Sequence, residues 1–266
     1  YIGDYAFYYC SKLMSVTIPE GVSSIGNSVF QGCKSITSMT IPFGVTSIGL
    51  WAFAECSELS SVTIPSSVIS IGGAAFSSCV KLTTVSIPAG VTSIGSQAFR
   101  GCGELTSVRL PPSVTSIGED AFKACGSLNT VLIDSLAKWC EMSFANNYSN
   151  PCSFGAKLFL NGEELVDAVI PDGVASIGNY VFYGCSSLRS VLIPDTVTST
   201  GVDVFSGCSE MSTMIGWRPN IVVASAKKIV VSDCVTSIGD GAFSGYDLLE
   251  SITIPESVTS IGVDIL

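Results

Sequence analysis

The sequence predicts an α/β repeat: a solenoid of 23-residue coils with one parallel sheet face and short helical or 3-10 turns. Phenylalanines recur every 23 residues, each followed three residues later by a cysteine and preceded by an Ile-Gly pair. After an interruption the frame returns at Ile177, Phe182 and Cys185. A unit this short cannot bury its apolar face alone, so we expect neighbouring units to stack. The recurring pairs are Phe7 and Cys10, Phe30 and Cys33, Phe53 and Cys56, Phe76 and Cys79, Phe99 and Cys102, and Phe122 and Cys125.

Each unit divides into three parts. In the consensus L-T-S-V-T-I-P, apolar residues alternate with Ser and Thr, as in a strand with one buried face. A proline such as Pro65 then ends the strand because it cannot donate to a ladder. The V-T-S-I-G stretch turns the chain, with glycine at the corner. The following A-F-x-x-C fits one short helical turn that places Phe and Cys on the same side.

The repeated cysteines are predicted to be packing residues. Equivalent positions of stacked coils lie about 5 Å apart and their side chains point the same way, which disfavours disulfide geometry. A straight column does not converge on a metal ion as zinc ligands do. Cysteine is small, often buried and inert among apolar atoms. We therefore expect reduced, buried thiols in the column, and no metal or other cofactor.

Composition excludes several function classes. The net charge is −10 with twelve Lys and Arg among 266 residues, which argues against nucleic acid as a partner. No apolar run reaches the length of about 18 residues that a membrane span needs. Histidine is absent, which removes the commonest general base and metal ligand. We therefore expect no enzyme. No secretion signal is recognisable, and both ends fall within repeats.

The pattern C-x-x-L-x-x-V-x-I-P-x-x-V-x-x-I-G-x-x-A-F resembles the BspA-like class of leucine-rich repeats over nearly the whole chain. The resemblance implies a right-handed, curved leucine-rich solenoid, here a single unit over residues 1–266. It also implies a cell-surface or secreted protein that binds other proteins or mediates adhesion. Members of the class share no catalytic residues, so none are transferred to this chain.

The first break in the repeat is an insert at about 135–164. Cys140 and Cys152 stand outside the 23-residue frame and are the candidate disulfide; the alternative is two free thiols packed under the insert. Asn147 begins an Asn-Tyr-Ser sequon, which is usable if a eukaryote secretes the protein. Asn161 and Gly162 predict the tight turn of a hairpin.

The second break is a shortened, irregular coil at about 215–231. Trp217 and Arg218 stand where the proline turn is expected, and these residue types dominate binding hot spots. They form one candidate contact site. The alternative is that Trp217 covers the edge of the shortened coil. Cys234 also lies outside the cysteine column and is a candidate exposed thiol.

A third feature is the outward position between Val and Ile of each strand. It is Ser or Thr in most coils and becomes Arg109, Leu132, Val169 and Leu192 in the middle of the chain. An exposed apolar patch tends to mark an interface, although the insert folding over Leu132 and Val169 is an equal alternative. The sequence favours a non-enzymatic module that binds a protein or glycan ligand. The alternative is a rigid architectural subunit of a larger assembly.

Overall fold

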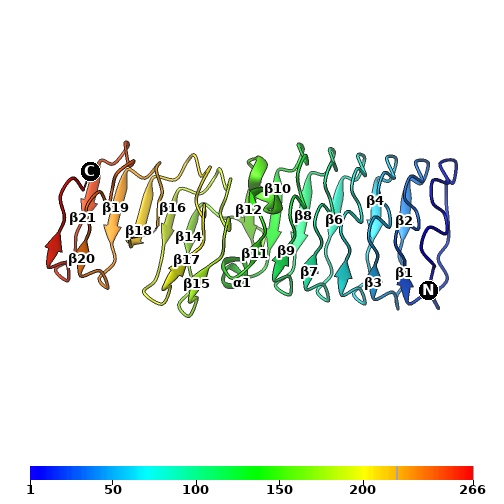
Figure 1. The fold of residues 1–266 in the computed structure, drawn as a ribbon, viewed down its shortest axis with the longest axis horizontal. Helices are drawn as coiled ribbons and strands as arrows, with labels where there is room; N and C mark the ends of the chain where they lie inside the picture. The colour runs from blue at the N-terminus through cyan, green and yellow to red at the C-terminus, as the bar shows by residue number, and fades with distance from the viewer. Residues whose placement is uncertain (220, 266) are drawn as a thin grey trace.

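The computed structural model describes residues 1–219 and 221–265 and shows a β-solenoid whose coils lie side by side along one axis (Figure 1). The two ends of the chain lie at opposite ends of this rod. Most coils are 23 residues long, since equivalent residues such as Ser47 and Ser70 pair in parallel. The 23-residue β-solenoid expected from the sequence is therefore confirmed, with parallel sheets and almost no helix.

One side of most coils carries the Val-x-Ile strand, and these front strands pair in parallel within three sheets. Their prolines and polar flanks keep them short. Their bounds are β2 (Ser38–Thr40), β4 (Ser61–Thr63), β6 (Thr84–Ser86), β8 (Ser107–Leu110), β10 (Thr130–Ile133), β12 (Lys157–Leu160), β14 (Asp167–Val169), β16 (Ser190–Leu192), β18 (Thr213–Trp217), β19 (Lys228–Val231) and β21 (Ser251–Thr253).

The opposite side carries two-residue rear strands at the Ser-Ile corner of each coil. A glycine follows most of them because the coils approach closely there: a Cβ on Gly49 would lie 2.5 Å from the backbone of Gly26. The rear strands are β1 (Ser24–Ile25), β3 (Ser47–Ile48), β5 (Ser70–Ile71), β7 (Ser93–Ile94), β9 (Ser116–Ile117), β11 (Ser143–Phe144), β15 (Ser176–Ile177), β17 (Ser199–Thr200), β20 (Ser237–Ile238) and β22 (Ser260–Ile261).

The segment around each phenylalanine is a chain of tight turns and not a continuous helix. Bonds of the i→i+3 type, such as Cys56 N–H to the Phe53 carbonyl at 3.3 Å, alternate with left-handed residues such as Trp51 (φ 53°) and Glu55 (φ 60°). This geometry turns every second N–H toward the next coil. In one coil Trp51, Phe53 and Glu55 donate to the carbonyls of Gly73, Ala75 and Ser77 at 2.9, 2.8 and 2.7 Å.

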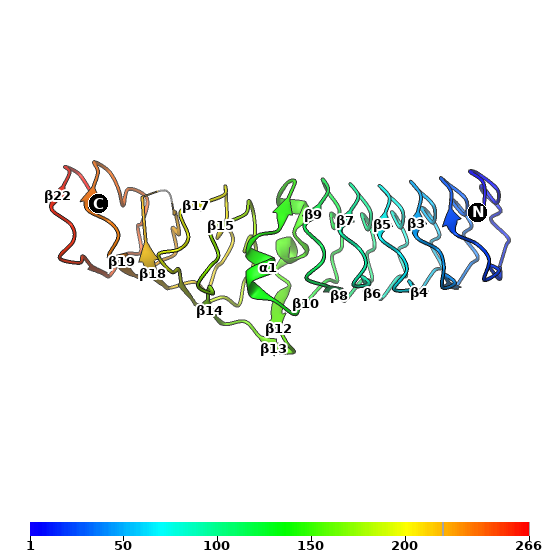
Figure 2. The same ribbon diagram turned by 90° about the horizontal axis from the view of Figure 1, so that it is seen from below.

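The insert supplies most of the regular helix that the structure describes. Helix α1 (Leu136–Cys140) begins at Ser135, whose side chain accepts a bond from the Lys138 N–H. Two 3-10 helices, η1 (Asn147–Ser149) and η2 (Pro151–Phe154), follow it. Strand β12 then pairs antiparallel with β13 (Glu163–Glu164). Figure 2 shows this hairpin reaching outward from the middle of the rod.

Stacked phenylalanines run along the interior. Neighbouring rings lie 5.2–5.5 Å apart between centroids and are nearly parallel, with interplanar angles from 2° to 15°. Such contacts add about 0.5–1.5 kcal/mol per pair to the burial of the rings. The column joins the Val, Leu and Ile positions in one core that runs from Ile18 to Tyr246.

The cysteine column is buried and reduced, with one exception. From Cys33 to Cys125 the thiols are free and fully buried, which confirms the packing interpretation. Each donates to the carbonyl of the preceding coil's phenylalanine, as Cys79 does to Phe53 at 3.1 Å. Burial raises the pKa of Cys56 and Cys125 to about 12. The prediction was wrong for Cys10, which is exposed in this structure.

The two cysteines of the insert do not form the disulfide considered from the sequence. Cys140 and Cys152 are both free and buried, as the alternative held. Cys152 instead contacts Cys185, whose pKa is raised by a hydrogen bond with the Cys152 thiol and by burial. Cys152 thus continues the column that it was expected to leave. The reason is that the insert adds length on either side of it while the coils still stack.

We expect native thiol labelling to modify Cys10 and Cys234 rapidly and to leave the nine buried cysteines unmodified until the chain is denatured. Buried thiols with raised pKa values are both inaccessible and protonated at about pH 8. Mass spectrometry of peptides after a timed pulse of a maleimide reagent measures this. Fast native labelling of Cys56 or Cys79 would contradict the packing interpretation.

Candidate partner-binding surface

The outward face of the front strands carries apolar side chains in two separate sheets, which together we call the apolar row. Alternation along each strand places its middle positions in register: Leu132 pairs with Phe159, and Leu192 pairs with Val169 on one side and Ile215 on the other. Ser and Thr occupy the equivalent positions elsewhere, as at Thr40 and Thr63. The apolar row consists of Leu132, Phe159, Val169, Leu192, Ile215 and Val230.

Much of the apolar row is exposed to solvent. Val169 is 61% exposed, and Leu192 and Ile215 are each 37% exposed. Leu132 is half-buried beside Phe159. The insert therefore does not fold over Val169; its own Phe159 lies beside Leu132 in the neighbouring sheet. Exposed apolar side chains of this kind, next to Ser and Thr at the equivalent positions of other coils, are typical of an interface.

Sequence reasoning identified only part of this row. Phe159 was missed because the insert hides its strand from the 23-residue frame, although Leu158 and Phe159 alternate as inward and outward residues do. Ile215 and Val230 were missed because they flank the shortened coil. In each case the signal was the alternation of the strand itself.

Arg109 borders the apolar row at its N-terminal side, in register with Leu132. Its guanidinium lies 2.6 Å from a carboxylate oxygen of Asp134, and half of the Arg109 side chain is exposed. An exposed pair of this kind contributes about 0–1 kcal/mol to stability. Arg109 is thus free to exchange Asp134 for another acidic group at low cost.

The structure corrects the placement of Trp217. A left-handed Gly216 (φ 87°) shifts the register within β18, so that Trp217 pairs with Val231 and points inward. Trp217 is 1% exposed, packs on Phe243 at 4.4 Å and donates from its indole N–H to the Tyr246 hydroxyl. It is a core residue and presents no surface to a partner.

Arg218 is also committed to the fold. Its side chain is 14% exposed and donates to the carbonyls of Pro194 and Val197 and to the carboxylate of Asp195. A hydrogen bond from Ser232, followed by the bond from Arg218, lowers the pKa of Asp195. Arg218 therefore ties the shortened coil to the turn of the preceding coil, and we no longer assign it to partner binding.

Asn147 occupies 3-10 helix η1 and not an open loop. Its side-chain amide donates to the Tyr183 hydroxyl at 3.3 Å. The sequon hydroxyl of Ser149 is buried and donates to the Gly118 carbonyl at 2.8 Å. Glycosylation of Asn147 stays a prediction, and it would have to precede folding of the insert.

The described residues contain no group of three or more acidic, cysteine or histidine side chains arranged to hold a metal ion. Nor is any helix among them long and apolar enough to cross a membrane. The exposed side chains that distinguish the middle of the front face are Arg109 and the exposed members of the apolar row.

Comparison with known proteins agrees with this architecture. The family description "BspA type leucine rich repeat region" matches six copies across residues 1–129, 152–219 and 222–266. The chain belongs to the BspA-type leucine-rich repeat family. The two gaps in the BspA-type match fall at the insert and beside Trp217, where the coils depart from 23 residues. The comparison with curated proteins found no match.

Solved structures of bacterial leucine-rich repeat proteins are similar to the chain. A leucine-rich repeat protein from Bacteroides ovatus shares 26% identity with a TM-score of 0.59, covering 98% of this chain and 78% of its own. A leucine-rich cell surface protein from Faecalibacterium prausnitzii shares 25% identity with a TM-score of 0.42, covering 95% of this chain and 69% of its own. The first of these likenesses supports the BspA-type solenoid.

We expect Arg218→Met to lower the free energy of unfolding by about 1–3 kcal/mol, because it leaves two partly buried carbonyl acceptors, those of Pro194 and Val197, without their donor. Arg218→Lys should recover little, since one ammonium cannot reach the acceptors that the planar guanidinium spans. Urea unfolding followed by circular dichroism measures both. The exposed Arg189 provides the control, and Arg189→Met should stay within about 0.5 kcal/mol. Equal effects at the two positions would contradict the structural role of Arg218.

Proposed function

We propose that this chain is a non-enzymatic binding module, which uses the apolar row of its front face to hold a protein ligand. A single observation carries the proposal: exposed Val169, Leu192 and Ile215 form one line, at positions where coils nearer the N-terminus carry Ser or Thr. Burial of apolar area contributes about 25 cal/mol per Å², and hydroxyl groups that stay solvated add little. The favourable free energy of binding would come from this line.

The surroundings of the apolar row suit an interface. The outward residues two positions earlier in the same strands are polar or charged, as at Lys157, Asp167 and Lys228. Lys157 lies 3.0 Å from a carboxylate oxygen of Glu164. An apolar line with a solvated polar border has the anatomy of a non-obligate protein interface. The mixed signs of the border favour a partner without a strong net charge.

Membership of the BspA-type family supports a repeat scaffold used for recognition, and the family typically lacks catalysis. Adhesion at a cell surface or after secretion belongs to the same proposal, because the family resemblance implies that location. A glycan ligand is the competing case. It would depend on the Ser and Thr hydroxyls beside the row and little on the aliphatic side chains.

Binding by the intact chain to a panel of immobilised extracellular-matrix proteins and mucin glycans tests the proposal. We expect Leu192→Asp and Ile215→Asp each to weaken binding of the protein ligand at least tenfold, because a carboxylate cannot be desolvated in the contact. Biolayer interferometry measures the affinity. Both side chains lie on the surface, so circular dichroism should show unchanged folding.

The matched controls are Thr40→Asp and Thr63→Asp, which place the same charge on the same face outside the apolar row. They should change affinity by less than about twofold. Binding that tolerates Leu192→Asp and Ile215→Asp would overturn the proposed surface. A chain that binds no member of the panel would contradict the binding module and favour the architectural alternative.

A further inference from the structure

The shortened coil opens a cavity between two turns of the solenoid. Thr213 pairs with Lys228, only 15 positions further along, so the front strands β18 and β19 stay adjacent. The rear side loses a layer there: β17 pairs with β15 and β20 with β22, and the described residues place no rear strand between β17 and β20. A cavity of about 770 Å³ lies in this position, which is within the size range of ligand sites.

One wall of the cavity is the coil that contains Phe205. Its backbone N–H groups would donate to the next coil, but that coil is shortened here. In the preceding coil Tyr180, Phe182 and Gly184 donate to the carbonyls of Val202, Val204 and Ser206 at 3.0, 2.9 and 2.9 Å. The equivalent N–H groups one coil later belong to Asp203, Phe205 and Gly207. Within the described part of the chain, these three donors make no hydrogen bond to a backbone carbonyl. All three residues line the cavity.

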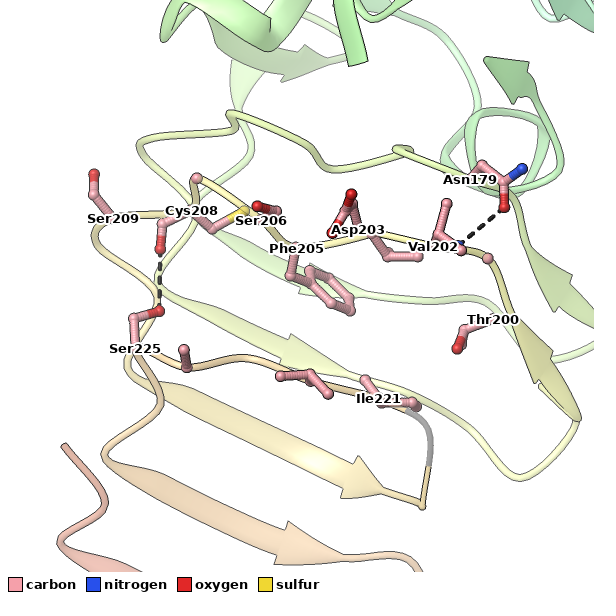
Figure 3. Close-up of a pocket in the computed structure, with 15 residues that line it drawn as sticks. Asn179, Thr200, Val202, Asp203, Phe205, Ser206, Cys208, Ser209, Ile221 and Ser225 are labelled. Carbon is pink, nitrogen blue, oxygen red and sulfur yellow. Dashed lines mark hydrogen bonds between the residues drawn. The ribbon is translucent and has the colours of Figure 1, made fainter. Parts of the chain in front are cut away.

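The other wall is the segment from Ile221 to Ser225. We call the cavity between these two walls the slot. The Ser225 hydroxyl donates to the Cys208 carbonyl at 3.2 Å and closes one end of it (Figure 3). Figure 3 also shows the ring of Phe205 directed toward the Ile221 segment. Val202 and Val222 are 57% and 66% exposed and give the slot apolar borders.

We propose that this slot binds an extended, uncharged peptide segment of another protein. The bound peptide takes the place of the missing rear half of the shortened coil and does not pair with the front strands. Peptides that add to a row of free main-chain donors gain affinity from backbone bonds and specificity from alternate side-chain pockets. Asp203 is the only charged residue among the described lining residues, so a neutral apolar segment fits. The site is separate from the apolar row and does not depend on the function proposed for it.

The chain itself shows what such a segment must offer. In an intact coil, the carbonyls of Ser96, Ala98 and Arg100 accept from Ala74, Phe76 and Ser78 at 2.8, 2.8 and 2.7 Å. The Phe99 ring stacks on Phe76 at 5.5 Å in the same segment. A ligand with carbonyls at three alternate positions and an apolar side chain between them would therefore meet Asp203, Phe205 and Gly207 in the same way.

Amide hydrogen exchange on the whole chain tests this proposal. The probe is a capped synthetic peptide of residues 93–102 carrying Arg100→Gln and Cys102→Ser, which leaves it uncharged. In the free chain we expect the amides of Asp203, Phe205 and Gly207 to exchange at least tenfold faster than those of Tyr180, Phe182 and Gly184. Saturating peptide should slow the first three at least tenfold and leave the second three unchanged. The same peptide with Phe99→Asp should have no effect.

Variants of the wall complete the test. Ala224→Trp fills the slot and should abolish the slowing, whereas Ala89→Trp, at an exposed turn far from the slot, should preserve it. If Ala224→Trp fails to fold, Val222→Asp places a charge on the exposed border and should weaken the peptide effect at least tenfold. Slow exchange of the three amides in the free chain would overturn the proposal. So would exchange that the peptide leaves unchanged, or slowing that survives both wall variants.

Discussion

The fold depends on hydrogen bonds between equivalent positions of successive coils. Every second N–H around each phenylalanine points at the next coil, as Trp51, Phe53 and Glu55 show, and this requires a left-handed residue at two places in each turn. Non-glycine residues in that conformation are strained when they stand alone. The neighbouring coil compensates for the strain with bonds and with ring stacking, so the local geometry and the stacking stabilise each other.

This dependence explains the places of the small residues. Gly49 brings the rear corners so close that any side chain would overlap the preceding backbone. Cys79 fits beside the phenylalanine column because its thiol is small and can still donate to the Phe53 carbonyl. The cysteines are thus selected by volume and by one weak hydrogen bond, and burial suppresses their ionisation.

The regular part of the fold could be predicted from the sequence because strict spacing carries over into strict stacking. The same spacing misled where the chain departs from it. Cys152 was placed outside the column because it breaks the 23-residue frame, although it contacts Cys185 in space. Trp217 was left open between a contact site and a cover for the edge of the shortened coil, because a bulge at Gly216 cannot be seen in an alternating pattern. Of the candidate surface, Leu132, Val169 and Leu192 followed from the pattern, whereas Phe159 became apparent only through the pairing of β10 with β12.

The shortened coil has a mechanical consequence. In an array where each unit contacts only its neighbours, resistance to separation is a sum of interface terms. Between the coils that carry β17 and β20 the rear contribution is missing, and the load falls on the front pairing of β18 with β19 and on the contact of Trp217 with Phe243. Of these two, β18 is the longest strand that the structure describes, with five residues. A rod pulled or bent from its ends would therefore hinge at this interface, with the front strands acting as the hinge.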